Sequence, residues 1–259
     1  MKLRLVRVFG LMIALLLPVM SLPFHAASAD TLPQTVQSIK RSLVGIGTFQ
    51  ALRRPPVDLN GSGFVVHDGL HVVTNYHVVS KGVDNTSQER IIVIIGNGRN
   101  YTDRTAKIVA IDAEHDLALL EIQGEPLPTV RLGKGGMMAE GTSIALTGYP
   151  IGSILGVYPV THKGIVAAIT PIKIPQADSR FLDAAMILRS PFDVYQLDVT
   201  AFPGNSGSPV YDSSTGRVEA ILNSTFVKET KERALSDPTG ISFAIPIIYV
   251  HQLLKKAGL

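Results

Sequence analysis

Three polar residues far apart in the sequence have the types that nucleophilic catalysis needs: His77, Asp116 and Ser206. An alcohol attacks a carbonyl at neutral pH when a base takes its proton and a third group orients that base. Serine, histidine and aspartate can fill these three roles. Each residue alone also has an ordinary explanation, since serine and aspartate are common in turns and a lone histidine beside a strand is most often structural. Their surroundings decide between the two interpretations.

Ser206 lies in the segment "PGNSGSPV", residues 203–210. Gly, Pro, Asn and Ser dominate turns, so the segment could be only a surface loop. Alternatively, Ser206 is a nucleophile, and glycine at 204 lets a backbone N–H turn toward a developing negative charge. We interpret Ser62 as a turn residue and Ser208 as a residue that packs or hydrogen-bonds behind the site.

Short runs rich in Val and Ile, separated by Gly, Pro, Asn and Asp, position these residues. The predicted strands are 61–66, 71–79, 90–96, 106–111, 116–122, 143–150, 163–169, 208–212, 217–223 and 240–246. About ten strands at this spacing predict a β-sandwich or β-barrel. Residues 32–45 and 247–257 have helical spacing instead. We therefore expect one all-β domain with short N- and C-terminal helices.

The first 29 residues have the order of a secretory signal peptide: a basic start, a short apolar run and Ala27-Ser28-Ala29. We expect cleavage there, export to the periplasm or the medium, and no stable membrane insertion of the protein that remains, residues 30–259. The leader carries three cations and no anion, so 21 Lys and Arg then balance 21 Asp and Glu. This balance argues against a nucleic-acid partner, which would favour a basic surplus. With no cysteine in the chain, the fold needs no disulfide.

The segments "GSGFVV", "VVTNYHVV", "HDLALLEI", "PGNSGSPV" and "GISFAIP", in this order, resemble the trypsin-like serine proteases and specifically their HtrA/Deg-type branch. The order His, Asp, Ser is that of chymotrypsin, whereas α/β-hydrolases run Ser, Asp, His and would have glycine at position 208. The resemblance covers roughly residues 32–257. It implies two perpendicular six-stranded antiparallel β-barrels, about 44–140 and 141–246, with the active site between them and a helix over 247–257.

By this resemblance, Ser206 attacks the scissile peptide carbonyl, His77 acts as general base and then acid, and Asp116 orients His77. The oxyanion hole is expected at Gly204–Asn205, from the backbone N–H groups of Gly204 and Ser206, with Asn205 shaping the loop. The activity implied is that of a serine endopeptidase acting through an acyl-enzyme on protein or peptide substrates, unfolded proteins in particular.

The same resemblance places a substrate pocket at Thr200, Ala201, Asn223, Ser224 and Thr225. Thr200 is uncharged where the pocket floor is expected, which argues against a preference for Arg or Lys. No histidine occupies 223–225, which argues against a preference for Glu. We therefore predict that the substrate residue bound in this pocket has a small or medium aliphatic side chain.

Neither a cofactor nor a metal is expected, because the remaining histidines are not spaced as metal ligands.

The HtrA-type resemblance suggests a trimer through the N-terminal segment, although the apolar residues of 32–49 could equally pack on their own barrel. Ser208, where these relatives usually have glycine, and the expected lack of a PDZ domain depart from the branch. Two alternatives remain open: an inactive protease homologue that acts as a binding or chaperone protein, and an esterase.

Overall fold

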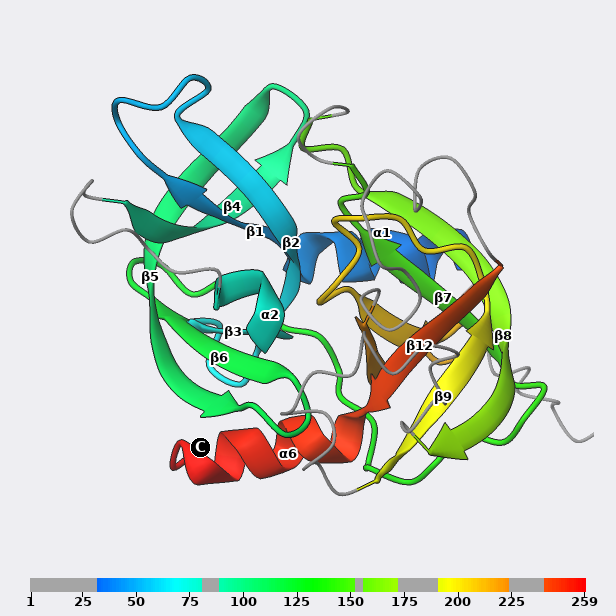
Figure 1. Cartoon of the computed structure of the whole chain (residues 1–259). Coiled ribbons are helices and arrows are strands. Elements are labelled where there is room, and N and C mark those ends of the chain that lie inside the picture. The colour runs from blue at the N-terminus through cyan, green and yellow to red at the C-terminus, as the bar shows by residue number, and fades with distance from the viewer. Residues whose placement is uncertain (1–31, 81–88, 152–155, 172–190, 224–239) are drawn as a thin grey trace, which may run out of the picture.

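A computed structural model describes residues 32–80, 89–151, 156–171, 191–223 and 240–259 (Figure 1). The predicted signal peptide, together with Ser224 and Thr225 of the predicted pocket, lies outside these residues. Within them, the strands form two closed antiparallel barrels, in the order β1-β2-β3-β6-β5-β4 and β10-β11-β12-β9-β8-β7. The expected all-β fold of two six-stranded barrels is confirmed.

The N-terminal barrel comprises β1 (Leu43–Phe49), β2 (Val57–Val66), β3 (His71–Asn75), β4 (Arg90–Asn97), β5 (Asn100–Asp112) and β6 (Leu117–Ile122). The C-terminal barrel comprises β7 (Ser143–Gly148), β8 (Val160–Pro171), β9 (Asp193–Asp198), β10 (Pro209–Asp212), β11 (Val218–Asn223) and β12 (Ile241–Pro246). Three helices accompany them in the described residues: α1 (Leu32–Ser42), α2 (Tyr76–Val79) and α6 (Ile247–Lys256).

Elements near the start of the chain and in the second barrel differ from the sequence-based expectation. The helix predicted over 32–45 ends at Ser42, because residues 43–49 form β1, which pairs with β2 on one side and β4 on the other. β9 was not among the predicted strands, and it closes the second barrel between β8 and β12. In both cases the backbone bonds of neighbouring strands decide the conformation, and these partners lie far away in the sequence.

Each barrel has its own apolar interior, and α6 covers the junction of the two. Val65, Val93 and Leu120 are among the buried residues of the first barrel, and Leu146 and Leu197 are among those of the second. α6 runs below the barrels (Figure 1), and its buried side chains join one cluster with residues of both. The cluster includes Phe64, Leu119, Tyr211, Ile245, Val250 and Leu253. This packing fixes the barrels against each other, so that loops from both can form one site.

α1 packs on the chain's own second barrel through Ile39, which is 3% exposed and lies in the α6 cluster with Tyr211 and Val218. Among the described residues, none of the helices has the length and apolarity needed to cross a membrane. Nor do three or more His, Cys, Asp or Glu side chains gather as metal ligands in that part of the chain.

Candidate active site

The pairing of β3 with β6 brings His77 next to Asp116. Asn75, the last residue of β3, lies opposite Leu117, the first residue of β6. His77 follows two residues after the end of β3, in the one-turn helix α2, and Asp116 directly precedes β6. The sequence predicted His77 at the end of a strand over 71–79, but that strand ends at Asn75 and the chain turns into α2.

Four hydrogen bonds hold these two turns together. The Asp116 backbone oxygen accepts from the Tyr76 N–H at 3.0 Å and from Asn75 Nδ2 at 3.1 Å. The Asp116 carboxylate accepts from the His77 N–H through Oδ1 at 2.8 Å and pairs with His77 Nδ1 through Oδ2 at 2.6 Å. Asp116 has φ +52°, a left-handed conformation that Asp adopts more readily than most residues. The ring of His77 is thus positioned by both its backbone and its Nδ1.

A third donor reaches the same carboxylate. Asn223, at the end of β11, donates from Nδ2 to Asp116 Oδ2 at 2.7 Å. The Asn223 side chain was predicted to line the substrate pocket, but it is fully buried and directed at Asp116. Because the carboxylate only accepts, His77 must carry a proton on Nδ1 to pair with it, which leaves Nε2 as the basic nitrogen of the neutral ring.

Ser206 lies against the same end of the first barrel. Its backbone oxygen accepts from the Ser62 N–H at 2.8 Å, and Ser206 is only 4% exposed. Gly61 lies between Ser206 and α2, since a Cβ at Gly61 would meet Val78 at 2.8 Å and the Ser206 oxygen at 3.0 Å. Val78 is the neighbour of His77 in α2. The contact at Gly61 therefore brings the backbone of Ser206 close to the helix that carries His77.

In the loop before Ser206, hydrogen bonds hold the peptide plane on each side of Gly204. The Pro203 oxygen accepts from the Ile151 N–H at 2.6 Å, and the Gly204 oxygen accepts from Ser62 Oγ at 2.8 Å. Gly204 has φ +96°, and a Cβ there would overlap the Tyr149 backbone oxygen, so only glycine fits. No acceptor for the Gly204 N–H is found among the described residues.

Asn205 and Ser208 are both fully buried in this loop. The Asn205 N–H donates to the Phe202 oxygen at 3.0 Å, so this N–H is used within the loop. The side-chain amide of Asn205 and the hydroxyl of Ser208 have no hydrogen-bond partner among the described residues. A Cβ at Gly148 would meet both side chains, which places them together behind the loop.

Thr200 and Ala201, the remaining described residues of the predicted pocket, are half-buried after β9. The preceding residue, Val199, is tied to β12 because its oxygen accepts from Ser242 Oγ at 2.6 Å. The ring of His162 on β8 lies 5.9 Å from that of Phe202. Burial lowers the pKa of His162 below its ordinary value. The segment leading to Ser206 is thus framed by β8 and β12.

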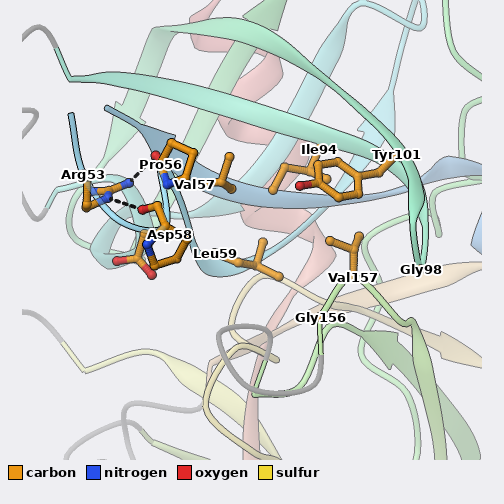
Figure 2. Close-up of a pocket in the computed structure, with 11 residues that line it drawn as sticks. Arg53, Pro56, Val57, Asp58, Leu59, Ile94, Gly98, Tyr101, Gly156 and Val157 are labelled. Atoms are coloured by element: carbon orange, nitrogen blue, oxygen red, sulfur yellow. Dashed lines mark hydrogen bonds between the residues drawn. The ribbon is translucent and has the colours of Figure 1, made fainter. Parts of the chain in front are cut away.

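A cavity of about 510 Å³ lies at the seam of the two barrels (Figure 2). Val57, Leu59 and Ile94 contribute from the first barrel, and Gly156 and Val157 close the other side. Val57, Leu59, Ile94 and Val157 belong to the cluster around Tyr149, whose pKa burial raises to about 12. The cluster that contributes to the cavity wall therefore includes the residue whose backbone oxygen abuts Gly204.

Sequence reasoning missed three contributors to this site: Ser62, Asn75 and the amide of Asn223. The interpretation of Ser62 as a turn residue is wrong, because Ser62 lies inside β2. Each is a small polar residue within or at the end of an apolar strand, and each is fully buried in the structure. Buried polar groups are nearly always hydrogen-bonded, so a polar residue in such a run indicates a specific partner. The sequence pattern does not indicate which partner, because the partners lie on other strands.

A family model described as the trypsin-like peptidase domain matches residues 61–221. The probable periplasmic serine endoprotease DegP-like of Pseudomonas putida (strain W619) is 34% identical over 205 residues, which cover 76% of this chain and 35% of that protein. Protease Do-like 5, chloroplastic, of Arabidopsis thaliana is 31% identical over 196 residues, covering 74% of this chain and 54% of that protein. The chain thus spans about a third of the bacterial relative and about half of the plant one.

Solved structures match the double barrel as well. The crystal structure of Deg5 superimposes with a TM-score of 0.61 at 27% identity and covers 85% of this chain and 90% of that one. HtrA-type protease AlgW with tripeptide gives a TM-score of 0.64 at 25% identity, over 87% of this chain and 62% of that one. Together with the geometry around His77 and Asp116, these matches show that the chain belongs to the trypsin-like peptidase family, as an HtrA-like member.

Proposed function

We propose that this protein is a serine endopeptidase that hydrolyses peptide bonds through an acyl-enzyme on Ser206. The observation that carries the proposal is the Asp116 carboxylate, which pairs with His77 Nδ1 at 2.6 Å and holds the His77 N–H at 2.8 Å. This arrangement leaves Nε2 of His77 to take the proton of Ser206 and later to give it to the leaving amine.

The oxyanion hole would use the N–H groups of Gly204 and Ser206. A negative charge develops on the carbonyl oxygen as Ser206 attacks, and each donor directed at it typically contributes 10²–10³-fold in rate, on the order of 3–4 kcal/mol. The Gly204 N–H, which has no acceptor among the described residues, supports this role, as does the loop geometry that Pro203 and Asn205 maintain.

The substrates would be proteins and peptides, with a small or medium aliphatic residue before the scissile bond. The uncharged Thr200 supports this preference, because an Arg or Lys side chain would need a carboxylate at the pocket floor. The relative from Pseudomonas putida is named a probable periplasmic serine endoprotease, which supports export of this protein and proteolysis outside the cytoplasm. Unfolded proteins are the substrates that we propose.

Profiling cleavage of a random peptide library by the purified protein tests this proposal. We expect cleavage after aliphatic residues and no cleavage by the Ser206→Ala variant. Equal cleavage by that variant would assign the activity to a contaminant. No cleavage of either the library or an unfolded protein would favour a binding or chaperone function. Turnover of small esters without peptide cleavage would favour an esterase.

A trimer formed through the N-terminal segment is a second part of the proposal. The buried Ile39 and Leu43 pack within the chain itself, so the segment would have to use other residues at such an interface. Light scattering on the purified protein gives the mass directly: three chains are expected, and a monomer at all concentrations would exclude the trimer.

A further inference from the structure

Ser62 links the two barrels directly behind the predicted oxyanion hole. It lies on β2 of the first barrel and is fully buried. Its hydroxyl donates to the Gly204 oxygen at 2.8 Å and accepts from the Tyr149 N–H at 2.9 Å. Its backbone N–H donates to the Ser206 oxygen at 2.8 Å. Three of its hydrogen bonds thus reach the second barrel, and two of them depend on the one side-chain oxygen.

Gly204 needs such an anchor because its own conformation is weakly determined. Glycine populates left- and right-handed conformations about equally, so nothing in the residue itself keeps φ at +96°. The Gly204 N–H belongs to the peptide plane whose oxygen, on Pro203, is held by Ile151. The next peptide plane is held at the Gly204 oxygen by Ser62 Oγ. Both planes must stay in place for the Gly204 N–H to keep its direction.

Tyr149 connects the two groups that hold the peptide planes around Gly204, the Ser62 hydroxyl and the Ile151 N–H. Its N–H donates to Ser62 Oγ, while its own backbone oxygen abuts the Cα of Gly204. The Ser62 hydroxyl therefore sets the distance between the segment 149–151 and the loop 203–205. Removing this hydroxyl would leave the Tyr149 N–H and the Gly204 oxygen without their partner in the protein interior, a state that a shift of the loop would relieve.

We infer that Ser62 is a positioning residue for the oxyanion hole. Its hydroxyl lies on the first barrel and holds the Gly204 peptide in the conformation that directs the Gly204 N–H at the substrate oxyanion. This inference rests on the proposed peptidase function. The nucleophile itself is held by the Ser62 backbone, whose N–H remains in a Ser62→Ala variant. The variant would therefore weaken transition-state stabilisation and leave the attacking residue in place.

Ser208 provides a matched control. It is fully buried like Ser62 and lies two residues from Ser206, and its hydroxyl has no hydrogen-bond partner among the described residues. Ser208→Ala thus removes one buried hydroxyl from the same region without breaking a bond to the Gly204 loop. Any general effect of deleting an oxygen near the site would appear in both variants.

The test compares wild type, Ser62→Ala and Ser208→Ala in the rate of labelling by a fluorophosphonate and in kcat and KM on a peptide chosen from the library profile. We expect Ser62→Ala to lower the labelling rate and kcat about 10- to 100-fold with little change in KM, since the donor is displaced and not deleted. Ser208→Ala is expected to stay within about twofold of wild type. Thermal unfolding of each variant measures folding separately.

Equal kinetics of Ser62→Ala and Ser208→Ala would overturn the inference, as would a rise in KM alone. If Ser62→Ala does not fold, Ser62→Cys decides in the same way, because its thiol fills the same place but donates weakly. Failure of the proposed function looks different: the wild type itself would neither be labelled nor cleave peptides.

Discussion

Asn223 Nδ2 and Asp116 Oδ2 lie 2.7 Å apart in the protein interior and join β11 of the second barrel to the turn before β6 of the first. This contact gives the carboxylate a donor in addition to the two from His77. Since Asp116 is 8% exposed, these donors replace the water that an ionised carboxylate would otherwise bind.

Asn223→Ala is expected to lower kcat/KM about 10- to 100-fold, which corresponds to the 1.5–3 kcal/mol that a hydrogen bond to a charged group contributes. Asn223→Asp should cost more, because a second carboxylate beside Asp116 would compete for the proton on His77. Steady-state kinetics on a library-derived peptide check both variants. Wild-type kinetics in Asn223→Asp would show that this contact has no part in catalysis.

Gly204→Ala is expected to abolish most of the activity, by at least about 100-fold, because its Cβ would overlap the Tyr149 oxygen and displace the loop. Gly141→Ala is the matched control: Gly141 also has positive φ, +83°, but among the described residues no atom outside its chain neighbours lies within 4 Å of its Cβ position. It should lose stability, about 1–2 kcal/mol, and keep its kcat/KM. Equal activity of the two variants would contradict the role assigned to the loop.

His162 is expected to make stability fall in mild acid. Burial lowers its pKa in the folded protein, so the unfolded chain binds more protons as the pH falls through the ordinary value of 6.5. Its contribution to stability is therefore complete above that value and decreases toward the lowered pKa. His162→Leu should reduce the loss of Tm between pH 7.5 and 5, by on the order of 1–2 °C.

Thermal unfolding at both pH values measures this effect. His67→Asn is the control, because His67 is exposed and its φ of +55° suits asparagine. A pH dependence that is unchanged in His162→Leu would assign the acid sensitivity to other groups.

Ile39→Ala tests whether α1 is part of the folded domain. Ile39 is 3% exposed among Tyr211, Val218 and Ile245, so its truncation should cost about 2–4 kcal/mol in urea unfolding. Gln37→Ala, on the exposed face of α1, should change stability by less than about 0.5 kcal/mol. If α1 served assembly alone, Ile39→Ala would instead dissociate an oligomer and leave the stability of the monomer unaltered.

The all-β class could be predicted from the sequence because strands leave local patterns, whereas the two barrels and the pairing of His77 with Asp116 were expected only from the resemblance to the trypsin-like serine proteases. Alternating apolar runs indicate strands, and chemistry restricts the residue types beside them. The bonds of Ser62 and Asn223 could not be predicted, since they join residues 142 and 107 positions apart. β1 was missed for the same reason: its residues 43–45 continue the helical spacing of α1, and only pairing with β2 and β4 makes them a strand.

The central claim is that Ser206 is a nucleophile activated by His77 and Asp116. Intact-mass spectrometry after exposure to a fluorophosphonate, followed by peptide mapping, tests it most directly. We expect one adduct per chain, located on Ser206, formed rapidly by wild type and at least about 10³-fold more slowly by His77→Ala. Absence of an adduct on the folded wild type, or an adduct on another residue, would contradict the claim.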